Sequence, residues 1–131
     1  LRTEGAINMK QPATTQNAPD APFLSQAIAS NGTIYVSGQI HSKPDGSIVD
    51  GSVKEKMDQI MQNITEILKA ANATINDVVK VVIYVTDMSQ MPELNEAYQS
   101  YFTEPFPVRE AVCVQALPLG ATIEISVVAS K

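Results

Sequence analysis

The sequence has very few of the cysteine and histidine side chains that bind zinc or form cross-links. Among its 131 residues there is one cysteine, Cys113, one histidine, His41, and no tryptophan. A single cysteine excludes an intrachain disulfide and a Cys-x-x-Cys redox motif. One imidazole and one thiol do not make the four-ligand set that structural zinc requires. We therefore expect no metal site and no fold held together by disulfides.

Positive charge is also scarce. Nine Lys and Arg residues stand against 14 Asp and Glu residues, which gives a net charge of -5 and an isoelectric point near 4.7. Proteins that bind nucleic acid use clusters of cations to neutralise the phosphates. The charge balance therefore predicts that nucleic acid is not a partner.

Long apolar runs are missing as well. No segment approaches the ~20 consecutive apolar residues that a membrane-spanning helix needs, so we expect no membrane partner. The start of the chain also lacks the pattern of a secretory leader. Met9 resembles a native start, and we expect residues 1–8 to be a leader remnant or a cloning remnant.

The remaining composition is that of one globular domain. Hydrophobic residues make up 44% of the chain and charged residues 18%, which is typical of a protein that buries a core. Domains most often contain ~100–150 residues. We therefore expect a single domain over residues 9–131.

Turn signals mark a hairpin in the first third of this domain. Residues 11–22 are rich in Pro, Thr and Asn and indicate an irregular segment. Asn31-Gly32 then separates two apolar runs, Phe23–Ala29 and Thr33–Ile40. An Asn-Gly pair between apolar runs is a strong hairpin signal, so both runs are predicted to be strands.

Two helices are predicted further along the chain. Apolar residues from Val53 to Ala71 recur at helical spacing, and Ser52 with Glu55 forms a capping-box pattern before them. This helix should end near Ala73. The other predicted elements are a strand at 80–86, a helix at about 91–102, and strands at 109–115 and 122–129. The expected order is β-β-β-α-β-α-β-β, in which one strand before the first helix has no assigned range, and it predicts an α+β domain with two helices on one face of a mixed sheet.

Alternation in the last two strands suggests what the other face of the sheet carries. In the final strand Ile125 should point to the helices, which leaves Glu124 and Ser126 on the opposite face. We also place Arg109 and Ala111 of the preceding strand on that face, away from the helices. A face that mixes small, apolar and polar groups is typical of a subunit interface with a wet cleft.

Several short motifs occur in an order and at spacings that characterise one family. They are QNAP at 16–19, SQAI at 25–28, SGQI at 37–40, VVKVVIYVTDM at 78–88, FPVR at 106–109 and LPLGATIEI at 117–125. With these motifs the sequence resembles the RidA (YjgF) family, which includes reactive-intermediate imine deaminases and carries the label L-PSP endoribonuclease. The likeness covers about residues 9–131.

The resemblance implies a fold, an assembly and an activity. The expected fold is chorismate-mutase-like, and three copies form a homotrimer with a barrel-like core and clefts between neighbouring subunits. The expected reaction is hydrolysis of 2-imino or enamine acids to 2-oxo acids and ammonia without a cofactor, as in 2-iminobutanoate/2-iminopropanoate deaminases. The expected ligand is a small 2-imino or 2-oxo acid, and the expected location is the cytoplasm or the mitochondrial matrix.

Five positions match residues that bind the substrate in the family. Arg109 in FPVR corresponds to a guanidinium that holds the substrate carboxylate through two hydrogen bonds. Ser37 and Gly38 in SGQI correspond to backbone donors, and a glycine allows close approach; the alternative for this pair is a structural β-bulge. Asn95 corresponds to a residue that lines the cleft or caps a helix. Ala111 offers only its backbone N–H.

Two positions depart from the family pattern. Leu24 stands where the family commonly has a tyrosine, and neither Leu24 nor Phe23 beside it carries a hydroxyl. Ser126 stands where a second glutamate positions the attacking water, and a serine is not a carboxylate base. Glu124, on the same face, is the alternative group for that water, or else forms a salt bridge at the trimer interface. The predicted catalytic residues are therefore Arg109, Glu124 and Ser126.

Three functions remain open on this basis. The first is the imine deaminase. The second is a ligand-binding or regulatory trimer that keeps Arg109 but turns substrate over slowly, which the two departures favour. The third is a ribonuclease, which the low isoelectric point, the single histidine and the lack of a basic aromatic patch disfavour.

Overall fold

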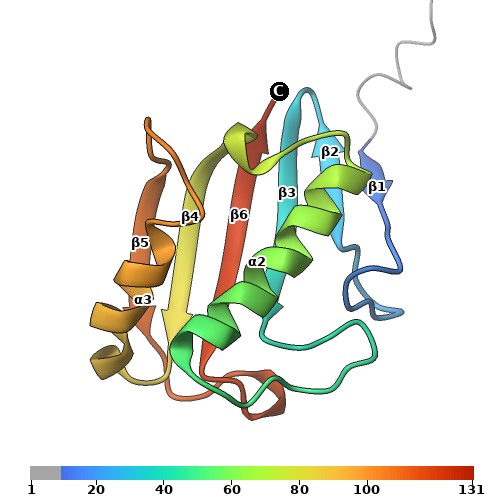
Figure 1. The fold of residues 1–131 in the computed structure, drawn as a ribbon. Coiled ribbons are helices and arrows are strands. Elements are labelled where there is room, and N and C mark those ends of the chain that lie inside the picture. Colours follow the sequence, from blue (N-terminus) through green and yellow to red (C-terminus); the bar gives the residue numbers. More distant parts are fainter. Residues whose placement is uncertain (1–9) are drawn as a thin grey trace, which may run out of the picture.

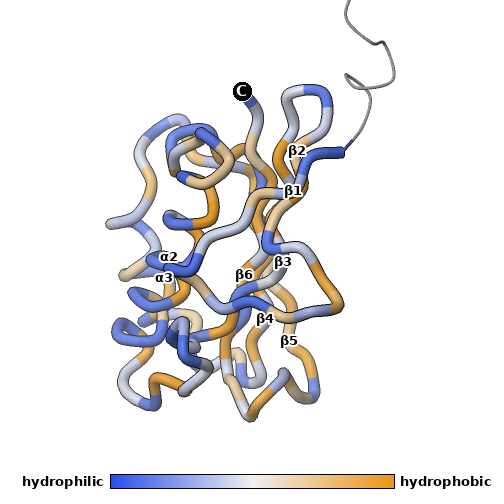
Figure 2. Tube along the Cα trace, turned by 90° about the vertical axis from the view of Figure 1, so that its right-hand side faces the viewer, coloured by the Kyte–Doolittle hydropathy of each residue, from blue (hydrophilic) through white to orange (hydrophobic). Residues whose placement is uncertain are grey.

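The protein is built from one sheet covered on one face by two helices (Figures 1 and 2). The structure, a computed structural model, describes residues 10–131; the predicted leader remnant at 1–8 lies outside them. The strand order is β1-β2-β3-β6-β4-β5, and neighbours are antiparallel except β4 and β5. The strands are β1 (Gln11–Ala13), β2 (Ala27–Ser30), β3 (Thr33–Ile40), β4 (Val78–Val85), β5 (Val108–Cys113) and β6 (Ile123–Ser130). This confirms the predicted α+β class and element order.

The long helix α2 (Val53–Ala70) begins where the sequence indicates. The hydroxyl of Ser52 accepts a hydrogen bond from the Glu55 N–H at 3.1 Å, and the Glu55 carboxylate accepts one from the Ser52 N–H at 2.9 Å. This capping box satisfies two N–H groups that the first turn leaves without partners. The helix ends at Ala70, earlier than the predicted Ala73, and Asn72 just beyond it has a left-handed φ of 60°.

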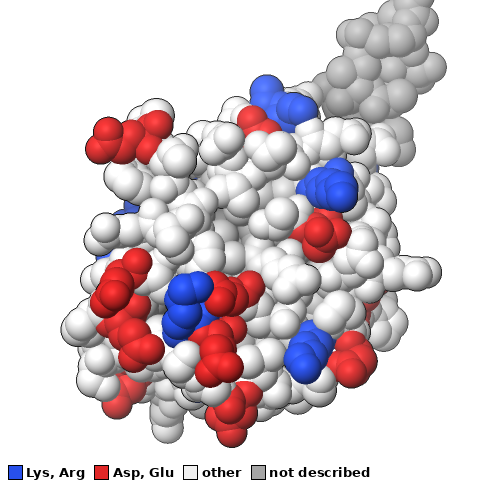
Figure 3. All heavy atoms as spheres, in the orientation of Figure 1, with Lys and Arg blue, Asp and Glu red and all other residues white. Residues whose placement is uncertain are grey.

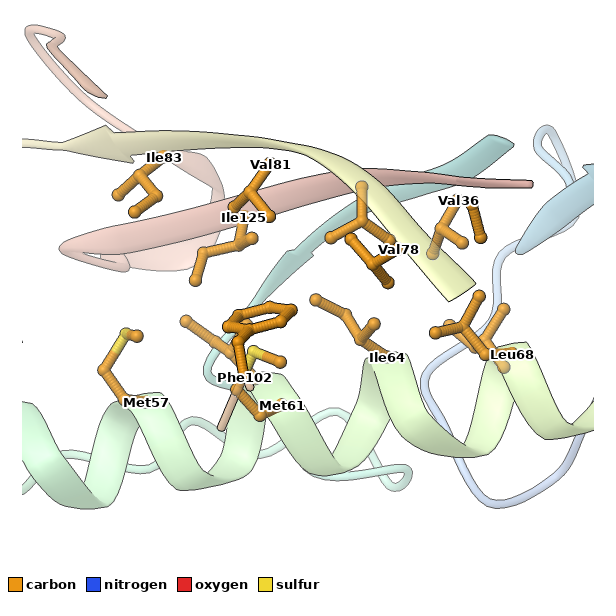
Figure 4. Packing of buried hydrophobic residues seen from close by; sticks show 14 of the residues in the cluster. Val36, Met57, Met61, Ile64, Leu68, Val78, Val81, Ile83, Phe102 and Ile125 are labelled. Atoms are coloured by element: carbon orange, nitrogen blue, oxygen red, sulfur yellow. The ribbon is translucent and has the colours of Figure 1, made fainter. Parts of the chain in front are cut away.

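The core lies between α2 and the middle of the sheet (Figure 4). Every second residue of β6, including Ile123 and Ile125, is fully buried, while Glu124 and Ser126 are half-buried on the far face. The predicted orientation of this strand is therefore confirmed. The buried face of α2 consists of Met57, Ile60, Met61, Asn63, Ile64, Ile67 and Leu68.

Other element boundaries also differ from the sequence-based prediction. A short strand, β1, occupies the start of the segment expected to be irregular, and it pairs with β2 at the edge of the sheet. The run predicted as a strand from Phe23 forms β2 only from Ala27, and Phe23 is 84% exposed in the preceding loop. The second helix, α3 (Met91–Tyr98), ends four residues before Phe102.

Strand β5 faces the opposite way from the prediction. Its parallel register places Arg109 beside Val81 and Ala111 beside Ile83, and both β4 residues are fully buried under the helices. Arg109 and Ala111 therefore lie on the helix face of the sheet. The prediction was wrong because alternation shows which residues share a face but not which face it is. An edge strand with few buried residues gives no further signal.

A bulge interrupts the pairing of β3 with β6. Val36 pairs with Val127 and Gln39 pairs with Ile125, so two residues of β3, Ser37 and Gly38, stand opposite Ser126 alone. One extra residue on one strand bends it and raises its local twist. The SGQI motif therefore does form a β-bulge, and the bulge lies on a strand that lines a pocket.

Candidate active site

A pocket of about 450 Å³ opens beside the bulge of β3. It lies between the loop before β2, the end of β3 and the turn before β6. Five residues predicted for the site line it: Phe23, Leu24, Ser37, Gly38 and Glu124. Its volume falls in the range of small-molecule sites. The other lining residues are Pro19, Asp20, Ala21, Gln39, Ile40, Ser42, Pro118 and Leu119.

Glu124 supplies the carboxyl group of this pocket. Its side chain lies directly against the Cα of Gly38, and a Cβ at Gly38 would collide with its Oε2 atom. Within residues 10–131 the carboxyl makes no hydrogen bond or ion pair, and burial raises its pKa above the ordinary value. A raised pKa brings a carboxyl group closer to the neutral range, where it can both accept and release a proton.

The other predicted polar groups on this face play different parts. The Ser37 N–H already donates to the Gln26 carbonyl at 2.9 Å, and the Ser37 hydroxyl donates to the Ser25 carbonyl at 2.5 Å. Both groups are therefore occupied in holding the bulge. Ser126 shares the face with Glu124 but is not among the residues that line the pocket.

Arg109, Asn95 and Ala111 form a second cluster at the edge of the sheet. The guanidinium of Arg109 donates to the Asn95 side-chain oxygen at 2.8 Å, and its Cζ lies 4.8 Å from the centre of the Tyr98 ring. Ala111 packs against the core on the same face. Sequence reasoning did not assign Tyr98 to the site, although its spacing of three from Asn95 places both on one face of α3.

The two clusters are not adjacent within one chain. Glu124 pairs with Tyr84, and Tyr84 pairs with Val112, so β6 and β5 lie two strand spacings apart. That separation is about 10 Å. Arg109 is also three residues further along β5 and faces the helices, whereas Glu124 faces away from them. A single subunit therefore does not bring the guanidinium and the carboxyl together.

The single histidine lies outside both clusters and is fully used by the fold. His41 Nε2 accepts a hydrogen bond from the Thr122 N–H at 3.0 Å, so the proton is on Nδ1, which donates to the Val49 carbonyl at 2.8 Å. Burial lowers the pKa of His41. In the part of the chain that the structure describes, no three metal-binding side chains cluster, and no helix is long and apolar enough to cross a membrane.

Comparison with known proteins identifies the family. A family model described as Endoribonuclease L-PSP matches residues 15–131. The human 2-iminobutanoate/2-iminopropanoate deaminase is 44% identical over 119 residues, which cover 88% of this chain and 86% of that protein. The chain belongs to this family, also called RidA/YjgF.

Solved structures of RidA/YjgF proteins share the fold. The crystal structure of yeast Mmf1 matches with a TM-score of 0.91 at 38% identity and covers 94% of this chain and 99% of its own. The structure of E. coli TdcF with bound serine matches with a TM-score of 0.86 at 29% identity and covers 93% of this chain and 99% of its own. The two helices on a mixed sheet are thus the arrangement of this family.

Proposed function

We propose that this RidA/YjgF protein hydrolyses 2-imino acids, and the enamines in equilibrium with them, to 2-oxo acids and ammonia without a cofactor. The carboxyl of Glu124 carries the proposal, because it has no hydrogen-bond or ion-pair partner among residues 10–131, lines a pocket of small-molecule size and has a raised pKa. The name of the human relative, 2-iminobutanoate/2-iminopropanoate deaminase, supports the same reaction.

In this proposal a complete site forms between neighbouring subunits of a homotrimer. One subunit supplies the Glu124 pocket and its neighbour supplies Arg109, since one chain keeps them on opposite faces of the sheet. The open face of the sheet supports such an assembly: Tyr35 and Val112 are 53% and 41% exposed there, and Val82, Tyr84 and Val128 beside them are half-buried. A sheet face that leaves several large apolar side chains exposed is typical of an interface.

The chemistry follows from these groups. The guanidinium of Arg109 binds the substrate carboxylate through two parallel hydrogen bonds, and Gly38 lets the reacting carbon approach the backbone. The substrate reacts as the protonated imine. Glu124 takes a proton from water as the water oxygen bonds to the imine carbon, giving a neutral tetrahedral amino alcohol. Glu124 passes that proton to the nitrogen and then accepts the hydroxyl proton as the C–N bond breaks with its electron pair on nitrogen, so that ammonia and a 2-oxo acid leave and Glu124 returns its proton to solvent.

Mixed trimers give the sharpest test. Arg109→Ala and Glu124→Gln chains, each inactive alone, are unfolded together, refolded, and assayed on imines made in situ by an amino-acid oxidase. If each site uses Arg109 of one subunit and Glu124 of the next, an equal mixture regains about a quarter of wild-type activity, because a cyclic trimer pairs the two intact residues in about one site of four. Mixtures that stay inactive, while wild type is active, would contradict the shared site.

A catalytically weak ligand-binding trimer is the second candidate. It is favoured by the pocket wall, where Phe23 and Leu24 bring no hydroxyl group to the site. Under this alternative, wild type matches the rate of buffer alone on several imines but still binds 2-oxo acids in calorimetry. If Arg109→Ala then loses this binding, the guanidinium of Arg109 holds the ligand carboxylate but takes part in no reaction.

The ribonuclease function is disfavoured by the same structure. His41 is held neutral by two hydrogen bonds inside the fold, so it is not placed as a general acid or base. On the helix face, acidic side chains gather over α3 and the start of α2, and cations are few (Figure 3).

As to location, the relative Mmf1 is named as mitochondrial, and we propose the mitochondrial matrix or the cytoplasm.

A further inference from the structure

The turn that closes one side of the pocket contains a residue in an unfavourable conformation. The Ala121 N–H donates to the Pro118 carbonyl at 3.0 Å, and the two central residues both have positive φ, 57° at Leu119 and 73° at Gly120. This is the pattern of a type I′ turn, whose first central position favours Asn, Asp or Gly. A leucine there bears the steric penalty of the left-handed region.

The side chain of Leu119 is also exposed in the single chain. It is 71% exposed and lines the pocket together with Phe23, which is 84% exposed, and Leu24, which is 46% exposed. We call these three residues the apolar wall. They come from two loops that are far apart in the sequence, and all three meet at the pocket that contains Glu124. Neither backbone preference nor core packing explains a leucine at this position.

The pocket thus combines a carboxyl group with exposed apolar side chains. In the proposed site, Glu124 and Gly38 suit the imino carbon of the substrate, and the apolar wall offers side-chain surface to whatever is attached to that carbon. We propose that the apolar wall, with Leu119 as its specificity-determining residue, selects 2-imino acids with branched aliphatic or aromatic side chains over the alanine-sized substrate. This inference rests on the proposed function and specifies its substrate class.

The expected size of the selection follows from hydrophobic contact. One methylene in a hydrophobic pocket changes kcat/KM by roughly 10-fold or more when it is well enclosed. The apolar wall is open on one side, so a smaller gain for each carbon is expected. The leucine-derived imine should therefore have a kcat/KM on the order of 10-fold above that of the alanine-derived imine.

The experiment compares two substitutions at one position. Leu119→Asn removes the apolar side chain and suits the type I′ turn, so it should fold and raise the Tm by about 2–4 °C. Leu119→Met keeps an apolar side chain of similar length in the same backbone. Imines are made in situ from alanine, leucine and phenylalanine by an amino-acid oxidase, and the ratio of kcat/KM for the large over the small imine is measured.

The apolar wall is supported if this ratio falls several-fold in Leu119→Asn and stays within about 2-fold of wild type in Leu119→Met. A wild-type ratio near one, or an unchanged ratio in Leu119→Asn, overturns it. If wild type hydrolyses no imine, the proposed function fails, and the selectivity of the apolar wall is then tested by calorimetric binding of 2-oxo acids. The apolar wall is supported if wild type binds 4-methyl-2-oxopentanoate more tightly than pyruvate and Leu119→Asn loses this preference. Equal affinities of wild type for the two ligands would overturn it.

Discussion

The guanidinium of Arg109 lies over the ring of Tyr98, with its Cζ 4.8 Å from the ring centre. The same guanidinium donates to Asn95 at 2.8 Å, so one face of α3 fixes both its plane and its direction. Tyr98 itself is 6% exposed and packs against Phe102, with ring centres 4.8 Å apart and ring planes tilted by 35°. The guanidinium that we propose as the carboxylate clamp is therefore oriented, on its edge strand, by a buried aromatic pair.

Replacing Tyr98 should weaken substrate binding through Arg109. A cation–π contact contributes about 0.5–1 kcal/mol at a partly exposed site, so Tyr98→Leu should raise KM by about 2- to 5-fold with a smaller change in kcat. Steady-state kinetics on an in situ imine measures this. Tyr98→Phe is the matched control, because it keeps the ring and removes a buried hydroxyl that has no hydrogen-bond partner within residues 10–131. Equal KM values for the two variants would contradict the orienting role.

Substitutions at two glycines should affect either the catalytic rate or the stability of the fold, but not both. An alanine at Gly38 displaces the Glu124 carboxyl, and because a 1 Å misplacement reduces rates on the order of 100-fold, kcat should fall steeply while stability changes little. Gly46 is the control: its Cβ would meet nothing within 4 Å, but its φ is +90°. Gly46→Ala should lower the free energy of unfolding by about 1 kcal/mol and leave kcat unchanged. Urea denaturation and initial rates measure both variants.

The raised pKa of Glu124 predicts opposite effects of pH on activity and on stability. In the proposed mechanism Glu124 accepts a proton from water in its base form, so kcat/KM should rise with pH through this raised pKa and then level off. The folded chain holds the Glu124 proton more tightly than the unfolded chain. The stability contributed by this group is therefore present below the unfolded pKa and lost as pH rises through the folded one.

Glu124→Gln should remove both effects. The variant should be inactive, as stable as wild type near pH 4, and more stable than wild type at pH 7, since it buries no charge. Denaturant midpoints at the two pH values, set beside the pH–rate profile of wild type, measure this. A variant less stable than wild type at pH 7 would mean that the carboxylate makes favourable contacts, such as an ion pair with a neighbouring subunit.

His41 should contribute to stability and not to turnover. Its pKa is lowered by burial, so the folded chain binds this proton more weakly than the unfolded chain. The stability it contributes is present above the unfolded pKa of about 6.5 and is lost as pH falls toward the folded pKa. His41→Gln should flatten the fall in unfolding free energy between pH 7 and pH 5. It should leave the midpoint of the pH–rate profile in place, and a shift in that midpoint would assign His41 to catalysis.

Local signals in the sequence predicted the parts of the fold that short-range contacts decide. Ser52 and Glu55 are three residues apart and fix the start of α2 by hydrogen bonds to each other. Ile125 and its neighbours alternate with period two in a strand buried on one face, so their orientation was predictable. Arg109 was not, because its face depends on a parallel register with β4, which residues near it in sequence do not encode.

The candidate site likewise contains residues that the sequence predicted and residues that only the structure identifies. Motif spacing singled out Gly38 and Glu124, and the structure brings them into contact. The sequence does not show which of Glu124 and Ser126 lines the pocket, because this depends on where the bulge opposite Ser126 lies. Leu119 went unnoticed because its backbone conformation, and not its residue type, is the unusual feature.

The bulge in β3 also determines which insertions or deletions this strand can accommodate. Val36 and Gln39 are both buried with two residues between them, so the extra residue shifts the phase of the inward and outward positions. A deletion of one residue at Ser37 or Gly38 would restore regular pairing and remove the backbone surface against which Glu124 rests. We expect point substitutions around the pocket to alter which ligands fit it, and we expect a single-codon deletion here to eliminate the pocket itself. We therefore expect the spacing between β2 and the end of β3 to vary less during evolution than the residues within it.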